Sequence, residues 1–563
     1  MRSPKSGVDR RQFLQITGSA TSALLASCKG GAGSSRPSAA DAAGPPGMDA
    51  PPAAGKDGSA SAPSADGSAG AGQGGTDGAG PAGKDAAAQA EQDARQRPAG
   101  PPAEADWQAL ASKLSGTLLR PTSGQYNQAR LLFNTRFDGI RPQAVARCAN
   151  PADVVAVLDF VQRFGLPVTS RSGGHSFAGY STGTGVVIDV GPMNAVQVGG
   201  GTATIGAGAK LADVYDQLIT RNVGVPLGTC LSVGIAGLTL GGGIGVIDRM
   251  YGLTCDSLVS AQVVTADLRV LTCDATNEPD LFWALQGGGG GNFGVVTSFT
   301  FRTHATRDLT NFVATYRFAD AAAVLAAWQT WQHALPDSIW SYLIFTFFDA
   351  GPPNVTLSGV CVGTPADFMP HWDQFVAAAR TPAASTSVNV VSYRDTMMGF
   401  CANRTVSQCH LVGQTPDGQI QRQSFASTSD LFDAPLPAEG IQAFLQGIRG
   451  AQSSNVRGQV LLDAMGGALG RVAPDATAFP HRGALFSAEY YMDAGGVASP
   501  TWSNSMRGVM KPWSSGRAYV NYMDPLITDV SAYHGANYAR LMRVKAKYDP
   551  DQVFRFPQGI PPA

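Results

Sequence analysis

Arg171-Ser172-Gly173-Gly174-His175-Ser176 follows directly on the short apolar run Leu166-Pro167-Val168-Thr169-Ser170. The run predicts a strand, and Gly185–Val190 predicts another one after the glycines. Before both, Ala152–Val161 carries apolar residues at helical spacing behind an Asn150-Pro151 start signal. A strand that runs into a Gly-Gly turn lets backbone N–H groups approach a pyrophosphate, because no Cβ stands in the way. On its own, a Gly-Gly pair is a weak signal.

Two further glycine segments strengthen the indication that the backbone comes close to a ligand. The first runs Gly228-Thr229-Cys230-Leu231-Ser232-Val233-Gly234-Ile235-Ala236-Gly237 and ends with Gly241-Gly242-Gly243-Ile244-Gly245. The second, Gly287 to Gly291, separates the helix-like Asp280–Gln286 from a β-rich stretch. Both are places where a backbone can come close to a ligand. A Rossmann fold is excluded, since no GxGxxG follows the first strand with an acidic residue about 20 positions later.

Together these segments resemble the berberine bridge enzyme-like FAD-linked oxidases of the vanillyl-alcohol oxidase / p-cresol methylhydroxylase superfamily. The resemblance runs from about Phe137 to Thr303 and resumes at the C-terminus, and bacterial and fungal oligosaccharide oxidases are closest in pattern. It implies an α+β fold: a two-lobed FAD-binding domain (PCMH type) and a substrate domain built as an antiparallel sheet covered by helices.

The resemblance also implies that FAD is attached bicovalently. The histidine of R-S-G-G-H-S bonds the flavin 8α-methyl and the cysteine of G-x-C-x-x-V-G bonds flavin C6, which are His175 and Cys230 here. Val233 occupies the position of a gatekeeper for oxygen, where valine resembles the oxidases; a packing valine is the alternative. The other expected cofactor contacts are Arg171, Ser172, Gly173, Gly174, Ser176, Gly234, Gly237, Gly242, Gly243, Tyr519 and Asn521.

For catalysis, the resemblance assigns the base to Tyr522, the last residue of the Y-x-N-Y pattern that begins at Tyr519. Asp463 matches a position that carries aspartate in carbohydrate oxidases, and Glu489 a position that faces the substrate. Thr477–Arg482 resembles a turn that lines the substrate cleft. Either carboxylate could instead be an ordinary solvated one. Hydride transfer from an alcohol requires that the hydroxyl proton leave as well, and a free tyrosine with a pKa of about 10 needs help near neutrality. We expect Asp463 to help as a proton acceptor or as part of a coupled pair.

The first 28 residues predict export. Asp9-Arg10-Arg11-Gln12-Phe13-Leu14 has the form of a twin-arginine signal, and a short apolar run after it ends Leu25-Ala26-Ser27-Cys28. That ending resembles a lipoprotein processing site, with Cys28 as the lipidated residue. Residues 29–104 are mostly Ala, Gly, Pro and Ser, a composition that buries too little apolar surface to fold and predicts a flexible tether. The expected location is therefore periplasmic, or extracellular and anchored at the outer membrane.

The remaining chain divides into an FAD-binding domain at 105–306, a substrate domain at 307–513 and a C-terminal segment at 514–563 that returns to the first. A net charge of −1, from 41 basic and 42 acidic residues, gives no reason to expect a nucleic acid partner. No HExxH, CxxC or similar ligand cluster predicts a metal. Among the cysteines other than Cys28 and Cys230, Cys401 and Cys409 form a local disulfide candidate, but the pairing of all six cannot be deduced.

The sequence thus predicts a secreted FAD-dependent oxidase of an alcohol. The expected substrate is the anomeric hydroxyl of a sugar or oligosaccharide, and dioxygen, the expected electron acceptor, would be reduced to hydrogen peroxide. Alternatives are a dehydrogenase that passes electrons to a quinone or another carrier, an oxidase of secondary-metabolite alcohols, and a flavin-loaded surface protein without turnover.

Overall fold

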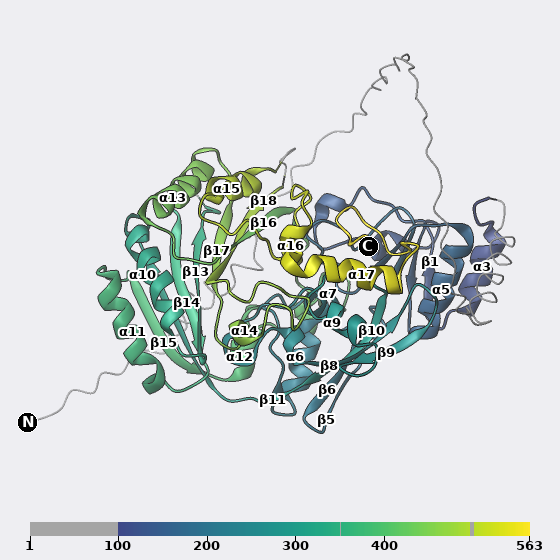
Figure 1. Ribbon diagram of the computed structural model, residues 1–563, viewed down its shortest axis with the longest axis horizontal. Coiled ribbons are helices and arrows are strands. Elements are labelled where there is room, and N and C mark those ends of the chain that lie inside the picture. The colour runs from purple at the N-terminus through teal and green to yellow at the C-terminus, as the bar shows by residue number, and fades with distance from the viewer. Residues whose placement is uncertain (1–99, 350, 496–499) are drawn as a thin grey trace, which may run out of the picture. The chain divides into compact units, whose positions relative to one another are not determined.

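The computed structural model describes residues 100–349, 351–495 and 500–563 (Figure 1). The predicted export signal and Cys28 lie outside these residues, as does the predicted tether up to residue 99. The first described helix begins at Glu104, at the predicted end of the tether. The α-helices are α3 (Glu104–Lys113), α4 (Tyr126–Ala129), α5 (Pro151–Phe164), α6 (Leu211–Ile219), α7 (Ile235–Leu240), α8 (Asp248–Tyr251), α9 (Pro279–Leu285), α10 (Ala321–Ala334), α11 (Pro365–Ala379), α12 (Tyr393–Gly399), α13 (Ala438–Ser453), α14 (Ala468–Arg471), α15 (Trp502–Met510), α16 (Ser531–His534) and α17 (Tyr538–Tyr548).

The first lobe (residues 104–305) contains two sheets and a short two-stranded pair. Its four-stranded sheet has the order β1-β2-β4-β3, with β2–β4 and β3–β4 parallel and β1–β2 antiparallel. The five-stranded sheet, β5-β6-β10-β8-β9, is antiparallel throughout. The strands are β1 (Thr117–Leu119), β2 (Ala144–Arg147), β3 (Val168–Arg171), β4 (Val186–Asp189), β5 (Val196–Gly199), β6 (Thr202–Gly206), β7 (Val223–Gly224), β8 (Leu258–Val264), β9 (Val270–Asp274), β10 (Val295–Arg302) and β11 (His304–Ala305).

Helix α5 and strand β3 place the first glycine turn. Asn150 caps the helix by accepting a hydrogen bond from the Asp153 N–H, Pro151 occupies the first turn, and Gly165 ends the helix with φ +64°. Strand β3 then runs parallel to β4 and stops at Arg171, directly before Gly173 and Gly174. The helix, both strands and the turn between them were predicted from the sequence and are confirmed.

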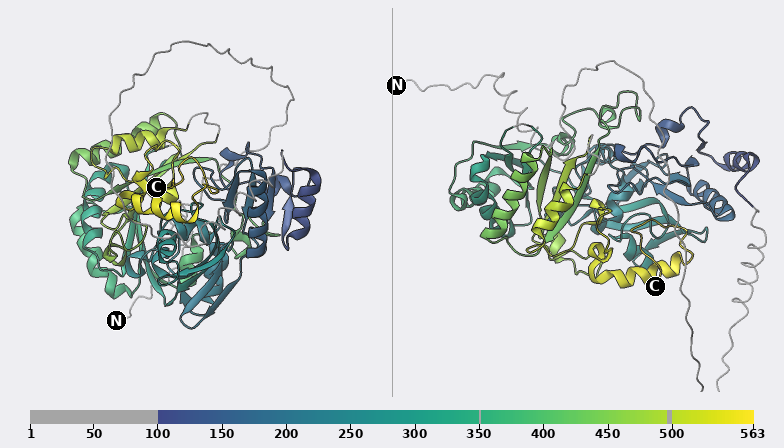
Figure 2. Two further views of the ribbon diagram at one scale, coloured as in Figure 1. Left: turned by 45° about the vertical axis from the view of Figure 1, so that its right-hand side comes forward. Right: turned by 90° about the horizontal axis from the view of Figure 1, so that it is seen from above.

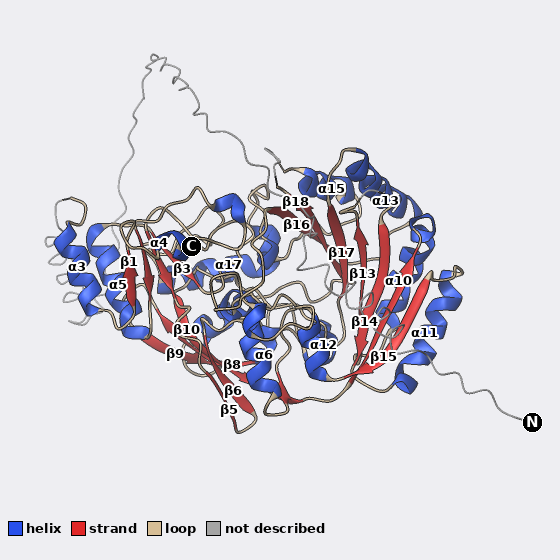
Figure 3. Ribbon diagram, turned by 180° about the vertical axis from the view of Figure 1, so that it is seen from behind, coloured by secondary structure: helices blue, strands red, loops and turns tan. Residues whose placement is uncertain are grey.

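The second lobe (residues 309–510) is built on one antiparallel sheet of seven strands, ordered β15-β12-β14-β13-β17-β18-β16. Figure 3 shows helices α10, α11, α13 and α15 on one side of this sheet, as the predicted fold class requires. The domain limits drawn from the sequence stay predictions. The strands are β12 (Leu309–Tyr316), β13 (Ile339–Thr346), β14 (Asn354–Cys361), β15 (Ser385–Val391), β16 (Phe425–Phe432), β17 (Gly458–Ala464) and β18 (Phe486–Asp493).

The two faces of this sheet have different partners, because successive side chains of a strand point to opposite faces. On β13 and β17, Leu343, Phe345 and Leu462 belong to the apolar core under the helices. Their neighbours in sequence, Tyr342 and Asp463, are opposite each other across the strand pair and line a cavity on the other face. Neighbouring residues of one strand therefore lie in different environments, one in the apolar core and the next on the cavity wall.

The C-terminal segment packs on the first lobe; in Figure 2 its yellow helix lies against the teal elements of that lobe. Helix α17 packs on α9 through buried residues such as Leu541. The buried Lys545 ammonium donates to the carbonyl oxygens of Asn292 and Phe554, 2.6 Å away in each case, and pairs with Asp549. These bonds hold the third glycine segment, Gly287–Gly291, beside the C-terminus.

None of the helices in the described ranges has the length and apolar character that crossing a membrane would require.

The separation of the two sheet faces gives a stability prediction. Leu462→Ala removes buried methyl groups from the helix-covered core, and we expect the free energy of unfolding to fall by about 2–5 kcal/mol. Val390→Ala, at an exposed position on the edge strand β15, should change it by less than about 0.5 kcal/mol. Urea unfolding followed by tryptophan fluorescence measures both. Equal losses in the two variants would contradict the assignment of the core face.

Candidate active site

A cavity of about 330 Å³ is lined by segments from both lobes and the C-terminus. Fifteen of the seventeen site residues predicted from the sequence line it. They are Arg171, Ser172, Gly173, Gly174, His175, Ser176, Cys230, Val233, Gly234, Gly237, Asp463, Glu489, Tyr519, Asn521 and Tyr522. The fold thus gathers at one cavity residues that are up to 351 positions apart in the sequence.

The two glycine loops of the first lobe are in backbone contact. A Cβ on Gly173 would lie 2.1 Å from the Gly234 nitrogen, and a Cβ on Gly234 would lie 2.1 Å from the Ser172 Oγ. No larger residue fits at either position without moving a backbone, since real Cβ contacts are not shorter than about 3 Å. This contact brings the loop of His175 against the loop of Cys230.

Predicted residues Gly242 and Gly243 do not line the cavity. A Cβ on Gly242 would meet the Phe479 ring at 2.9 Å and one on Gly243 would meet Thr254 Oγ1 at 2.3 Å. The Gly243 N–H donates to the Tyr519 hydroxyl at 3.0 Å, and the amide of Asn521 donates to the same oxygen at 2.9 Å. These glycines therefore tie the C-terminal segment to the second glycine loop.

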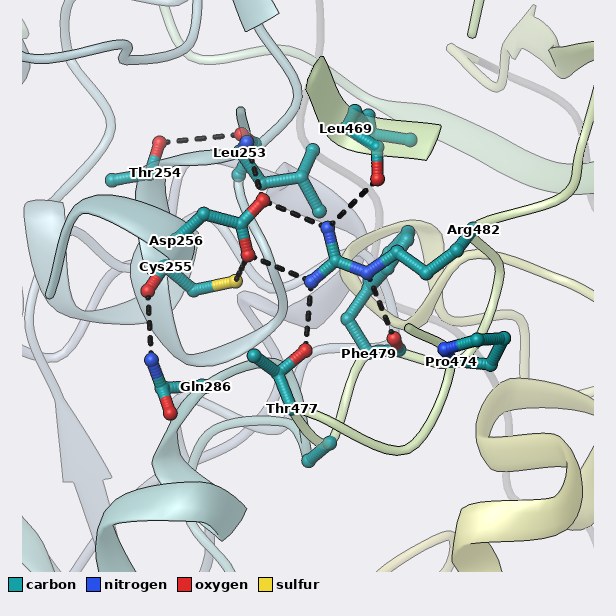
Figure 4. Close-up of polar contacts among 12 residues, drawn as sticks. Leu253, Thr254, Cys255, Asp256, Gln286, Leu469, Pro474, Thr477, Phe479 and Arg482 are labelled. Carbon is teal, nitrogen blue, oxygen red and sulfur yellow. Dashed lines mark hydrogen bonds and ion pairs between the residues drawn. The ribbon is translucent and has the colours of Figure 1, made fainter. Parts of the chain in front are cut away.

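The expectation that Thr477–Arg482 lines the substrate cleft is wrong. Within that segment, Arg482 is buried and forms two hydrogen bonds of 2.7 Å with the Asp256 carboxylate and a third, also 2.7 Å, with Thr477 (Figure 4). Phe479 packs edge-on against the Tyr519 ring. A buried arginine needs such a full set of partners to offset its desolvation, so the segment supports the glycine loop from behind.

Burial determines the protonation of His175. Its pKa is lowered to about 3, first by burial and then by the nearby positive charge of Lys210. The imidazole is therefore neutral at physiological pH and one ring nitrogen keeps its lone pair. Ser232 Oγ lies 3.2 Å from Nε2, and the Phe133 ring stacks on the imidazole at 4.2 Å.

Two carboxyl groups lie on the cavity face of the sheet. Leu461 is opposite Glu489 and Asp463 opposite Ser487 on the strand pair β17–β18, so the two carboxylates are diagonal neighbours. Burial raises the pKa of Asp463 to about 7. Burial also raises the pKa of Glu489 to about 8, with a further contribution from the charge of Asp463. The Ser427 hydroxyl donates to Glu489 Oε1 at 2.9 Å, and this hydrogen bond lowers the Glu489 pKa.

Tyr522 faces this pair from the C-terminal segment, where Val520–Tyr522 forms a 3₁₀ turn. Its pKa is raised well above 10, first by burial and then by the negative charges of Glu489 and Asp463, with a hydrogen bond to Glu489 in the same direction. The phenol therefore stays protonated and can act as a base only by passing its own proton to a carboxylate at the same time. The Phe177 ring stacks on Tyr522 at 5.1 Å and fixes its plane.

The remaining cavity wall comes from residues that the sequence analysis missed. Trp340, Tyr342 and Ile344 project from β13, while Phe425 and Tyr491 stack on each other at 5.1 Å across β16 and β18. Alternation of side chains along strand β13 could have indicated the first three. Phe400, Cys401, Ile420 and Gln423 line the cavity from the segment between α12 and β16, in which Cys401 and Cys409 form the predicted disulfide.

The residues present fit the FAD that the sequence predicts. Backbone groups of the glycine loops line the cavity, and a Cβ on Gly237 would meet nothing within 4 Å, so the chain leaves room beside that loop. Arg171 is anchored by Asp189 at 3.0 Å and by the Ala129 carbonyl at 2.6 Å, while its Nη1 is buried and bonded to no other described residue. A cavity with positive charge and backbone N–H groups suits a pyrophosphate, and His175 and Cys230 line the same cavity.

Comparisons with known proteins agree with this geometry. A family model described as an FAD binding domain matches residues 142–274, and one described as berberine and berberine like matches residues 518–561. The uncharacterised FAD-linked oxidoreductase YgaK of Bacillus subtilis is 33% identical over 466 residues, which cover 80% of this chain and 98% of YgaK.

Two solved structures are similar over most of their length. BBE-like 1 of Physcomitrella patens has a TM-score of 0.74 at 28% identity and covers 81% of this chain and 99% of its own. A chitooligosaccharide oxidase has a TM-score of 0.73 at 26% identity, with coverage of 82% and 100%. With FAD-binding loops, a C-terminal segment that closes on them and a relative at 33% identity, the chain belongs to the berberine bridge enzyme-like family of FAD-linked oxidoreductases.

Proposed function

We propose that this enzyme oxidises a sugar or oligosaccharide at its anomeric hydroxyl, with FAD bonded to His175 and Cys230. The observation that carries the proposal is the meeting of Tyr522, Asp463 and Glu489 at the cavity that His175 and Cys230 also line. The bound FAD supplies a hydride acceptor at N5 and passes the electrons to dioxygen. The protein supplies the base and the groups that orient the alcohol.

In this proposal the substrate hydroxyl gives its proton to Tyr522 as the hydride leaves the carbon atom that bears this hydroxyl. Tyr522 passes its own proton to the carboxylate pair, since a free phenolate beside two acids is strongly disfavoured. Only a pair with at least one ionised member can accept it. The protein thus moves one proton across the short hydrogen-bonded path from Tyr522 to Glu489.

The lining of the cavity supports a carbohydrate. Trp340, Tyr342 and Tyr491 contribute aromatic side chains to the lining, and the carboxylates of Asp463 and Glu489 are hydrogen-bond acceptors for hydroxyl groups. Similarity to a chitooligosaccharide oxidase at 26% identity supports the same class. Ile344, Ile420 and Leu461 make part of the wall apolar, which favours a secondary-metabolite alcohol as the second candidate.

Val233 supports dioxygen as acceptor, because it lines the cavity and valine at this position resembles the oxidases. The twin-arginine motif and Cys28 support export of the loaded enzyme and a lipid anchor at the membrane. Covalent attachment suits that location, since a lost cofactor would not be replaced there.

Attachment is tested by denaturation in acid with a thiol reductant, so that only carbon–nitrogen and carbon–sulfur bonds retain the flavin. We expect wild-type protein and the single variants His175→Ala and Cys230→Ala to keep yellow colour in the precipitate. The double variant should release all of its FAD to the supernatant. A double variant that still retains flavin would place the bonds at other residues.

The base is tested by anaerobic flavin bleaching against a panel of sugars, oligosaccharides and phenolic or polyketide alcohols. Tyr522→Phe should slow bleaching by the best substrate by about 10²–10⁴-fold, the usual contribution of a positioned base. Hydrogen peroxide released in air by wild-type enzyme should equal substrate consumed; a low yield would identify a dehydrogenase. No bleaching by any of the sugars, but bleaching by another alcohol, would replace the proposed substrate class.

The carboxylate pair predicts the pH dependence. Because Asp463 has a pKa of about 7 and Glu489 one of about 8, the rate of bleaching should rise with pH through this range as the acceptor ionises. Asp463→Asn leaves Glu489 as the acceptor and removes a negative charge that contributes to its raised pKa, so any remaining activity should rise in one step, at a pH below the wild-type Glu489 pKa of about 8. Stopped-flow bleaching from pH 5 to pH 9 measures both profiles. A rate independent of pH above 5 would exclude the buried pair as acceptor.

A further inference from the structure

The His175 imidazole is held from two directions by residues with no assigned role in the reaction. On one side the Ser232 hydroxyl lies 3.2 Å from Nε2. On the other side the Phe133 ring lies almost parallel to the imidazole, with 4.2 Å between the ring centres and 18° between the planes. Both side chains are more than nine-tenths buried. A ring with one edge bonded and one face covered cannot rotate freely about its bond to Cβ.

Ser232 is fixed by the loop that carries it. The Val233 N–H donates to the Cys230 carbonyl at 3.0 Å, which closes a tight turn around the serine. The same loop is bonded to helix α6, since the Ala212 N–H donates to the Leu231 carbonyl at 2.9 Å. The hydroxyl therefore has a defined position two residues beyond Cys230.

Phe133 is fixed by backbone bonds on both sides. Its N–H donates to the Gly174 carbonyl at 3.0 Å, directly before His175, and its carbonyl accepts from the Gln423 N–H at 3.1 Å. Arg422 reinforces this pairing from the second lobe, because its Nε donates to the Leu132 carbonyl at 2.6 Å and its guanidinium pairs with Asp138. The ring that covers His175 thus depends on contacts between the two lobes.

We propose that Ser232 and Phe133 are positioning residues for the bonding of His175 to FAD. The proposal rests on the attachment proposed above. In this proposal the Nε2–H donates to Ser232 Oγ, so that the lone pair lies on Nδ1, and the stacked Phe133 ring holds the imidazole in that orientation. Nδ1 is then the ring atom that forms the bond.

The bond between Nδ1 and the 8α carbon forms, one C–H bond of that methyl group and the Nε2–H bond break, and the ring proton leaves through Ser232. The two electrons of the broken C–H bond remain on the flavin, which is thereby reduced and takes up the two protons. Dioxygen, the acceptor of the proposed activity, restores the oxidised flavin and is reduced to hydrogen peroxide.

The test uses the Cys230→Ala full chain, in which only His175 can retain flavin, produced under riboflavin limitation and then incubated with FAD in air. Flavin in acid-precipitated protein is measured over time and divided by total bound flavin. Ser232→Ala should slow attachment about fivefold, the factor that one ordinary hydrogen bond is worth, whereas Ser232→Thr should keep the parent rate. Phe133→Leu should slow it about threefold and Phe133→Tyr should not.

These matched pairs separate positioning from folding, because thermal unfolding should be alike for Ser232→Ala and Ser232→Thr. An unchanged rate in Ser232→Ala, or an equal loss in both serine variants, would overturn the role of the hydroxyl while leaving attachment intact. A Cys230→Ala parent that retains no flavin in acid would overturn the histidyl bond itself, and the positioning role with it. NMR of the flavin peptide identifies the bonded nitrogen, and substitution at Nε2 would contradict the tautomer.

Discussion

The backbone contact between Gly173 and Gly234 is the constraint on which the cofactor side of this enzyme depends. Each glycine lies where the other loop leaves no space for a Cβ, so the two loops can meet only as bare backbone. Because they meet, a histidine that follows strand β3 and a cysteine about 55 residues later line one cavity. An alanine at either position would have to push the loops apart, and the separation of the two side chains would change with them.

The substrate side depends on a different constraint, the alternation of side chains along a sheet. Strands β13, β17 and β18 present one set of side chains to the helices, and present to the cavity the polar and aromatic residues together with Ile344 and Leu461. Two carboxyl groups, Asp463 and Glu489, are buried on the cavity face with few partners. Such burial opposes stability, because ionised carboxylates lose their hydration without full compensation. The enzyme retains both groups where Tyr522 requires a proton acceptor.

Much of the fold could be predicted because its signals are local. Helix α5 and strands β3 and β4 follow from periodicity, caps and glycine punctuation within about 15 residues. The disulfide between Cys401 and Cys409 was similarly accessible, since only eight positions separate the partners. The members of the candidate site were identified by motif, and the gathering of Asp463, Glu489 and Tyr522 at one cavity is a property of the folded chain.

What could not be predicted is the long-range packing behind those motifs. Arg482 was assigned to the substrate cleft, yet it pairs with Asp256, 226 positions away, and supports a glycine loop. Phe133 has no motif of its own, and it stacks on His175 where its backbone is bonded to Gly174 and to Gln423 of the other lobe. An apolar residue in a loop has no sequence signal that distinguishes a ring support from ordinary packing.

The segment between α12 and β16 belongs to the second lobe by chain connection and to the first by hydrogen bonding. Gln423 pairs with Phe133 and Thr135, Arg422 with Asp138, and His410 with Asp213 at 3.0 Å. Hinge opening of the two lobes as rigid bodies would break all of these bonds at once. Rigid-body hinge opening that moves this segment with the second lobe would therefore cost these bonds, whereas local movement of side chains and short loops at the cavity rim would leave them intact.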